Sequence, residues 1–355
     1  MLKRSIVLLG LLAVGLFSVG VTWAEELPTL YRGIRPLGMG GAFITLSDDE
    51  NAMFYNPAGL NDVSGFGGVS ILNPLLEVSK NSKSLYSDLK DLDTDNQAIV
   101  ADFLSKMVGE HQHVRAAALP NVFMHNFAIG VLGQGTLDMD IRNPGNPAVF
   151  TDIKLDTGLL VSGALGFFDQ QLQLGATGKF IKRDGIKHVY FAPEIAHKDF
   201  DPLDQREKKS DFAFDVGTKL SLKSPLRPTF ALVVQNITDL DFKELGIIPQ
   251  EVNVGASINP NFWILKTTFA VEVDDLTKNA DADKDLYKRT HLGAEFRFPK
   301  ILALRAGLNA GYVTAGVDLD FWILSVSAAT YAEEIGAFAG QRSDRRYIVQ
   351  ASLGF

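Results

Sequence analysis

Cysteine is absent from the 355-residue sequence, and histidine is scarce, with six residues. The lack of cysteine excludes a disulfide framework and any thiolate metal site. Acidic residues outnumber basic ones by 42 to 34, and this argues against nucleic-acid binding, because a phosphate backbone requires a basic surface. Beyond residue 24, no apolar run reaches the ~18 residues that a membrane-spanning helix needs. These absences leave an acidic protein whose activity depends on neither thiols nor nucleic acid.

The first 24 residues have the layout of a secretory signal peptide. A basic "MLKR" precedes the apolar "SIVLLGLLAVGLFSVGV", and small residues follow at Thr22 and Ala24. This pattern predicts cleavage after Ala24 and export from the cytoplasm. The alternative is a retained membrane anchor, which the short apolar run and the small-residue flank disfavour.

The C-terminal half alternates between apolar and polar residues with the period of a β-strand. In "DFAFDVGTKLSL", for example, Phe212 and Phe214 share one face, while Asp215 and Lys219 share the other. A soluble sandwich and a membrane barrel both produce this alternation. Full charges on the polar face, strands of ~9–13 residues and connections that alternate between short and long favour the barrel. We therefore predict an all-β protein, a transmembrane antiparallel β-barrel of about 14 strands over residues 63–355, in the bacterial outer membrane.

Residues 82–110 interrupt the β pattern. Apolar residues recur there at helical spacing, for instance at Leu85, Leu89 and Leu92. We expect a helical first extracellular loop. A helix packed on the barrel rim is the default interpretation, and a lid over an apolar binding site is the alternative.

Motifs for enzymatic or metal chemistry are not apparent. His111 and His113 form an isolated His-x-His pair, which is too little for a metal site. No nucleophile-elbow motif occurs, and the glycine-rich "GMGGAF" lacks the Lys-Ser/Thr pair of a phosphate-binding loop. The sequence therefore predicts a protein that is not an enzyme, with no cofactor and no metal.

One N-terminal stretch carries a family resemblance. "RPLGMGGAFITLSDDENAMFYNPAGL", which precedes the predicted barrel, resembles the FadL-type superfamily of outer-membrane transporters, including its PorV-like and uncharacterised branches. The resemblance implies that residues 25–62 form a hatch that plugs the lumen. The implied hatch motif comprises Gly38, Gly40, Gly41, Ala42, Asp48, Asp49, Asn56, Pro57 and Ala58.

From the residue types in this stretch we expect two local roles. Asp48 and Asp49 should cap backbone N–H groups or pair with lumen arginines. Asn56 and Pro57 should make a rigid turn in which the Asn56 side chain bonds local backbone.

The same resemblance implies a transport mechanism. Such channels bind hydrophobic molecules in an apolar pocket, rearrange the hatch and release the ligand sideways through a kinked strand. Gly130, Gly133 and Gly135 in the third predicted strand make it the candidate lateral-opening strand, although glycines tolerated in a barrel wall explain the pattern equally well.

The C-terminal region offers two further features. The alternating end of the chain, including Tyr347 and the terminal Phe355, is similar to the signal read by the outer-membrane assembly machinery. Arg342, Arg345 and Arg346 lie in a predicted long loop, where they either contact lipopolysaccharide phosphates or form a solvated basic loop.

The resemblance therefore implies passive uptake of hydrophobic compounds, either fatty-acid-like or hydrocarbon. The expected partners are a hydrophobic small molecule or lipid, the outer-membrane lipid and lipopolysaccharide, and the assembly machinery. The alternative function is that of a PorV-like barrel that binds exported proteins as a secretion-associated partner or scaffold.

Overall fold

The computed structural model describes residues 26–64, 66–82, 97–143, 147–195, 201–262, 264–280, 285–299 and 301–354. The predicted signal peptide with Ala24, the helical spacing around Leu85 and the terminal Phe355 lie outside these residues.

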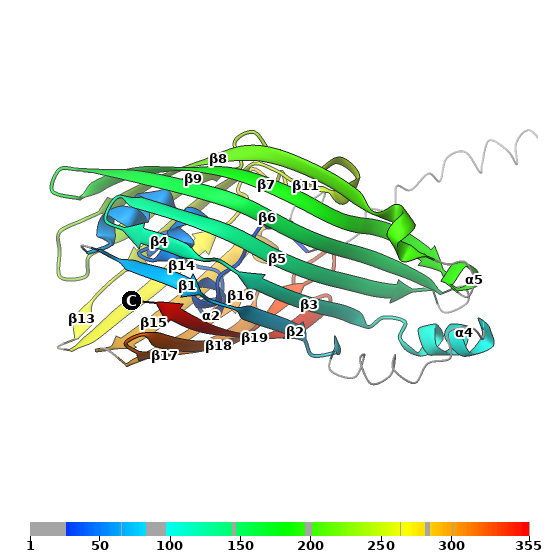
Figure 1. Cartoon of the computed structure of the whole chain (residues 1–355). Helices are drawn as coiled ribbons and strands as arrows, with labels where there is room; N and C mark the ends of the chain where they lie inside the picture. Colours follow the sequence, from blue (N-terminus) through cyan, green and yellow to red (C-terminus); the bar gives the residue numbers. More distant parts are fainter. Residues whose placement is uncertain are drawn as a thin grey trace, which may run out of the picture.

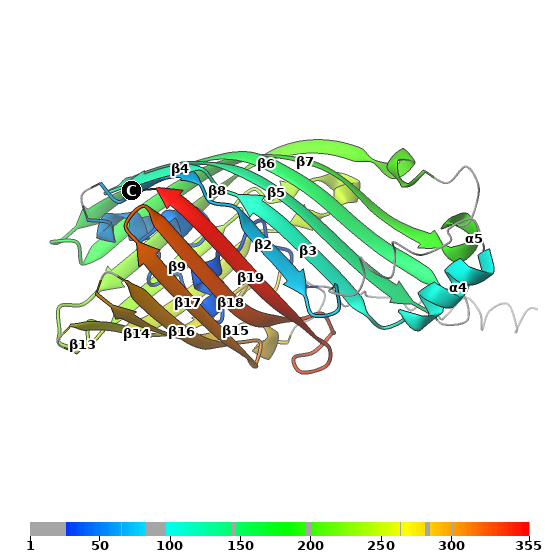
Figure 2. The ribbon, with the colours of Figure 1, turned by 60° about the horizontal axis from the view of Figure 1, so that its bottom comes forward.

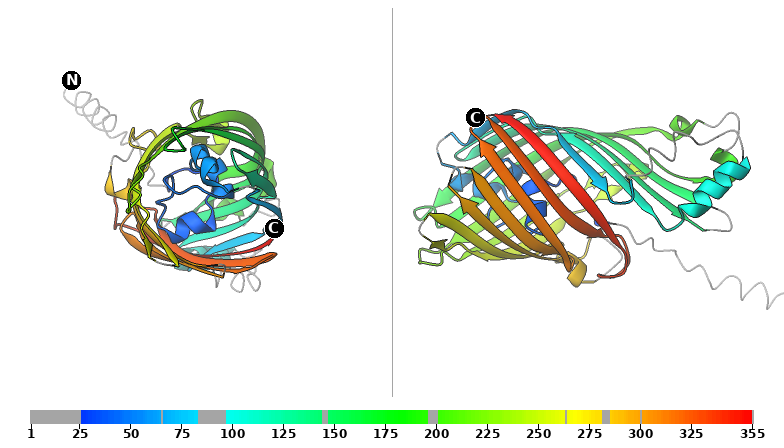
Figure 3. Two further views of the ribbon diagram at one scale, coloured as in Figure 1. Left: turned by 90° about the vertical axis from the view of Figure 1, so that its left-hand side faces the viewer. Right: turned by 90° about the horizontal axis from the view of Figure 1, so that it is seen from below.

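A single antiparallel sheet of 17 strands closes on itself (Figures 1 and 3). Its strands are β1 (Gly68–Leu72), β2 (Leu75–Ser79), β3 (His111–Ala118), β4 (Asn121–Met124), β5 (Phe127–Arg142), β6 (Ala148–Phe167), β7 (Leu172–Phe191), β8 (Glu207–Ser221), β9 (Thr229–Gln235), β12 (Glu251–Ile258), β13 (Asn261–Phe262), β14 (Leu265–Val273), β15 (Thr290–Phe298), β16 (Leu302–Asn309), β17 (Tyr312–Phe321), β18 (Leu324–Glu334) and β19 (Ser343–Gly354). β10 (Leu240–Asp241) and β11 (Ile247–Ile248) form a separate pair.

The helical elements of the described residues are short. They are α2 (Ile34–Gly38), α4 (Gln97–Lys106) and α5 (Ala192–Ile195), with the 3-10 turns η1 (Glu50–Met53), η2 (Pro57–Asp62), η3 (Pro202–Gln205), η4 (Lys243–Leu245) and η5 (Tyr287–Arg289). Within the described residues, no helix combines the length and apolar character needed to cross a membrane.

The sheet forms a closed barrel, and the wall is crossed 14 times by antiparallel strands, as predicted. Each crossing is here called a stave, and some staves consist of two of the assigned strands. β1 and β2 are two halves of one stave, β3 and β4 are halves of the next, and β13 continues β12 as the short end of the stave that pairs with β14. The first and last staves pair at Ser70 and Gly354, which closes the ring. Closure matters in a membrane because an open sheet edge would leave backbone groups without hydrogen bonds.

The alternation read from the sequence sets the two faces of the wall. On β8, Phe214 is 46% exposed on the outside, whereas its neighbour Asp215 is 1% exposed and faces the lumen. On β7, Phe180 and Lys179 divide in the same way. Apolar residues therefore cover the outer surface and charged residues line the interior, the arrangement of a membrane barrel.

The two ends of the barrel differ. One end, here called the short-turn end, has tight connections, such as the turn at Phe168–Gln170, and contains Gly354. At the other end, the long-loop end, β6 and β7 are 20 residues long each and extend beyond the rest of the wall. α4 and α5 lie near the ends of these long strands (Figures 1 and 2).

Candidate functional site

Residues 26–63, here called the N-terminal segment, lie inside the ring of strands (Figure 3, left). α2 packs against β16, β17 and β18, while η2 packs against β6, β7 and β8 on the opposite wall. The segment thus crosses the lumen. Its apolar side chains join the barrel wall in one buried cluster that includes Met53, Leu60, Leu119, Leu132 and Leu160.

The glycine-rich part of the segment touches the wall backbone directly. Gly40 has a φ of +68°, and a Cβ there would lie 2.6 Å from the carbonyl oxygen of Leu292. Facing glycines in the wall make the matching space, because a Cβ on Gly293 would lie 2.5 Å from the carbonyl oxygen of Met39. Glycine is required on both sides, since any side chain would separate the segment from β15. The glycines of "GMGGAF" thus serve close backbone packing, and this packing gives no support to a phosphate-binding loop.

Asn56 fixes the second contact. Its side-chain Oδ1 accepts a hydrogen bond from the backbone N–H of Ala58 at 3.0 Å, which caps η2, as predicted. Its Nδ2 donates to the carbonyl of Ile44 at 2.8 Å and to that of Thr218 on β8 at 3.2 Å. Gly217 makes room for this side chain, since a Cβ there would lie 2.1 Å from Asn56 Oδ1. Asn56 therefore ties the segment both to itself and to the wall.

Arg35 on α2 is the centre of the acidic motif. Its Nη1 donates to Asp48 at 2.5 Å and to Asp49 at 2.7 Å, and its Nε and Nη2 each donate to one oxygen of Glu295 on β15 at 2.9 Å. The predicted arginine partner is thus present, but it comes from the segment itself rather than from the wall. The fork geometry suits guanidinium, which binds a carboxylate through two parallel bonds.

The two aspartates and their neighbour Glu50 have distinct environments. Asp49 Oδ1 accepts from the backbone N–H of Asn51 at 2.9 Å, which is the predicted backbone cap. Against the effect of burial, the positive charge of Arg35 holds the pKa of Asp48 below its usual value. Burial and then the neighbouring charge of Asp49 raise the pKa of Glu50 to about 8. Glu50 therefore changes its charge near neutral pH.

The barrel wall is interrupted next to the segment. β1 and β2 are separated at Asn73–Pro74, and β3 and β4 at Leu119–Pro120. The two breaks face each other, and neither proline has an N–H to donate to a ladder. The Asn73 side chain closes the gap: its Nδ2 donates to the carbonyl of Leu119 and its Oδ1 accepts from the N–H of Leu119, both at 2.7 Å. One side-chain amide here takes the place of a backbone pair.

The glycines of the candidate lateral-opening strand lie beside this break. β5 itself is continuous and pairs with β6 along its whole length. A Cβ on Gly130 would lie 2.9 Å from the Met53 Cε of the segment, while a Cβ on Gly133 would have nothing within 4 Å and one on Gly135 only a Leu155 methyl group at 4.0 Å. Lateral opening at these glycines stays a prediction, and the interruption that the structure contains is in the two preceding staves.

A cavity of about 610 Å³ lies on the long-loop side of the segment. Its wall carries charged side chains of both signs, among them Arg115, Asp138, Lys154, Asp156 and Arg183. Many are paired inside the lumen, as Arg183 is with both oxygens of Asp156 at 2.7 and 2.9 Å. Apolar side chains such as Leu30, Phe150 and Ile248 line the cavity as well, so its lining is mixed, whereas the resemblance implied an apolar pocket.

Apolar residues gather instead at the long-loop end. Leu104 of α4 is buried with Ile141, Val149 and Ile186 of the long strands, and Phe103 packs against them. The described part of the predicted helical loop therefore packs on the rim, which was the default interpretation.

The predicted C-terminal residues are divided between two faces. Arg346 is 1% exposed and lies in the lumen, where it pairs with Glu26 at 2.6 Å and Asp344 at 2.8 Å, so it is removed from any surface that meets lipopolysaccharide. Arg342 binds Asp140, and Arg345 donates to the carbonyl of Val313. Lipopolysaccharide contact by these two stays a prediction, as does the assembly signal at Tyr347, whose side chain is 40% exposed on the outer surface.

The sequence model of one protein family, described as "F plasmid transfer operon, TraF, protein", matches residues 72–320. That range covers most of the chain. The chain belongs to this family. The matched residues run from the end of β1 through most of β17, so the family assignment rests on the barrel wall rather than on the N-terminal segment. A search of curated proteins finds no match.

Solved structures with a similar fold are known. The Ralstonia pickettii toluene transporter TbuX aligns over 92% of this chain and 98% of its own, with 12% identity and a TM-score of 0.51. A Pseudomonas aeruginosa FadL homologue aligns over 94% and 99%, with 13% identity and a TM-score of 0.49. At such low identity the likeness to TbuX concerns the fold alone: the chain shares the barrel fold of that protein over nearly its whole length.

Proposed function

We propose that this TraF-family protein is an outer-membrane channel for the passive uptake of hydrophobic molecules that carry a polar head, of the fatty-acid-like class. The apolar outer surface suits a lipid environment, and the predicted signal peptide supplies the route out of the cytoplasm. The fold is shared with a protein described as a toluene transporter, which supports transport as the activity.

The observation that carries the proposal is the interrupted wall next to the N-terminal segment. The gap between the first two staves is closed by the single side chain of Asn73. Directly behind it lies the buried cluster that the segment shares with the wall, including Leu75, Ala117 and Leu119. If the segment moves, this apolar surface becomes a lined passage from the lumen to the membrane. Compared with a route through water, this passage lowers the free energy of an apolar molecule by ~25 cal/mol for each Å² of its surface that stays out of water.

The charged side chains in the cavity favour one class of transported molecule. Removing water from ionised side chains costs several kcal/mol for each group that loses its partners, so a bare hydrocarbon is poorly accommodated there. A carboxylate or similar head can replace the lost water with hydrogen bonds from a partly exposed group such as Lys154. For this reason we favour the fatty-acid-like alternative over the hydrocarbon one.

The N-terminal segment acts as the hatch in this proposal. It is fixed to the wall by specific contacts along its length, among them Gly40 against β15, Arg35 with Glu295 and Asn56 against β8. Loosening one of these contacts should make movement of the segment easier while the barrel wall remains paired.

Uptake into liposomes tests the proposal. The purified barrel should speed entry of a radiolabelled medium-chain fatty acid, and should speed entry of a radiolabelled alkane of equal chain length much less. Asn73→Ala should increase the fatty-acid rate, whereas the matched control Asn259→Ala, at a tight turn, should leave it unchanged. Equal rates in protein-containing and protein-free liposomes would refute transport.

A second candidate is the protein-binding scaffold. The family description names a plasmid transfer operon, which suggests work beside other envelope proteins. The projecting long strands offer a surface for this, with exposed residues such as Leu155 and Phe191. Affinity purification from native membranes separates the two functions: a stoichiometric protein partner together with no faster fatty-acid entry would favour the scaffold.

A further inference from the structure

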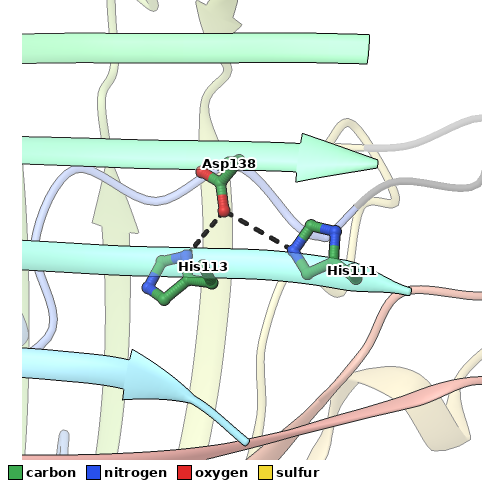
Figure 4. A group of neighbouring side chains, drawn as sticks. All are labelled: His111, His113 and Asp138. Carbon is green, nitrogen blue, oxygen red and sulfur yellow. Dashed lines mark hydrogen bonds and ion pairs between the residues drawn. The ribbon is translucent and has the colours of Figure 1, made fainter. Parts of the chain in front are cut away.

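Two histidines and an aspartate meet on the lumen wall, at the cavity on the long-loop side (Figure 4). His111 and His113 are two residues apart on β3, so both side chains point to the same face. Asp138 on β5 is the direct register partner of His113. Their ligand atoms all lie within 4.8 Å of one another.

The distances in this cluster approach those of a metal site. Asp138 Oδ1 lies 2.6 Å from His113 Nδ1 and 3.6 Å from His111 Nε2. In a tetrahedral zinc site, metal–ligand bonds of ~2.0–2.1 Å place neighbouring ligand atoms about 3.3 Å apart. The His111 distance fits this value nearly as it stands, and the His113 distance requires a side-chain shift of roughly 0.7 Å.

The remaining ring nitrogen of His113 is held by a carboxylate. His113 Nε2 lies 2.9 Å from Glu77 Oε1, and Glu77 is 1% exposed and fixed by Arg115 Nε at 2.9 Å. Metal-binding histidines almost always donate their second N–H to such a partner, which sets the tautomer and orients the ring. Glu77 therefore leaves Nδ1 as the nitrogen directed at Asp138.

His111 supplies the second observation. Its Nε2 is a buried atom without a hydrogen bond to any described residue, with Asp344 Oδ2 as a further carboxylate oxygen at 3.8 Å. A buried polar atom without a partner is costly in a folded protein. A cation between His111, His113 and Asp138 would satisfy it.

We propose that His111 Nε2, His113 Nδ1 and Asp138 Oδ1 bind a divalent first-row transition metal of the Zn²⁺ class. Two imidazole nitrogens and one carboxylate oxygen suit such an ion. On binding, the metal takes the place of the proton between His113 and Asp138, and that proton is released to solvent. Three protein ligands leave the fourth position directed to the cavity, open to water or to an anionic group. The isolated His-x-His pair of the sequence is thus completed by a residue from another strand.

Cobalt and zinc binding test this site on the full-length protein, stripped of metal and folded in detergent. We expect saturable binding of one Co²⁺ with a visible ligand-field band, and displacement of Co²⁺ by Zn²⁺. His111→Gln and Asp138→Asn should each weaken binding by at least ~10-fold. His188→Gln, a histidine on the same cavity wall outside the cluster, should bind like the unaltered protein.

His111→Gln is the deciding variant, because His111 Nε2 makes no hydrogen bond to described residues and the substitution leaves the His113–Glu77 hydrogen bond in place. Folding of each variant is checked by its heat-dependent mobility in detergent gels. Absence of a one-to-one Co²⁺ complex, or equal affinity in folded His111→Gln and unaltered protein, would overturn the proposal. Neither result depends on transport, so the proposed uptake function stands or falls separately.

Discussion

Replacement of Asn56 by alanine should open the channel without preventing barrel assembly. Asn56 is fully buried and makes three hydrogen bonds, to Ala58, Ile44 and Thr218. The bonds to Ala58 and Ile44 lie within the segment, so only the bond to Thr218 holds it to the wall, and its loss should cost the seated position ~1 kcal/mol. Since 1.4 kcal/mol is a factor of ten, the population of the displaced segment should rise roughly 5-fold.

Fatty-acid entry into liposomes measures this change, with Asn61→Ala as the matched control. Asn61 is also buried in the segment, but among the described residues its side chain donates a hydrogen bond to the neighbouring carbonyl of Ala58 and not to the wall. We expect a large increase in rate for Asn56→Ala and a much smaller one for Asn61→Ala. Normal folding with an unchanged rate would refute the reasoning, and so would failed assembly with unchanged permeability.

Two further predictions concern how the segment is seated. The seated segment raises the pKa of Glu50 from 4.5 to about 8, so it favours the protonated acid. As pH rises from about 4.5 to about 8, the seated position therefore becomes less stable relative to the displaced one, and flux should rise over this range. Glu50→Gln should flatten this profile in liposomes, whereas Glu244→Gln on the long-loop side should not, and an unchanged profile in Glu50→Gln would contradict the assignment. Gly293→Ala places a Cβ 2.5 Å from the carbonyl oxygen of Met39, so it should destabilise the seated position of the segment by ~1–3 kcal/mol and raise the flux. Gly163→Ala is the control, because its Cβ would have nothing within 4 Å, and it should leave the flux unchanged. Equal effects of the two substitutions would argue against tight seating on β15.

The barrel could be predicted from the sequence because its signal is local. Alternation along each strand places Phe214 outside and Asp215 inside whatever the neighbouring strands are. Tight turns, such as that at Asp169, follow from short polar breaks in the same pattern. The capping by Asp49 and Asn56 was equally local, since each side chain bonds a backbone N–H two residues ahead.

Contacts between distant strands could not be predicted. Asp138 meets His113 through the register of β3 and β5, which no spacing within either strand reveals. Arg346 illustrates the same limit: its place in a presumed loop suggested the surface, but it lies on β19 and faces the lumen. The wall gap had a visible signal in Pro74 and Pro120, but only the paired strands show that the two breaks face each other.

The central claim, that the N-terminal segment must move for passage, is tested most directly by locking it. A Cβ on Gly217 would lie 3.0 Å from Asn56 Cγ, close to the ~3 Å that separates Cβ from the partner sulfur in a disulfide. The chain has no cysteine of its own, so the double variant Asn56→Cys, Gly217→Cys offers a single pair. Oxidised protein in liposomes should admit fatty acid no faster than protein-free liposomes, and reduction should restore entry in the same sample. Equal entry rates in the oxidised and reduced states, with the disulfide verified by mass spectrometry, would contradict the claim.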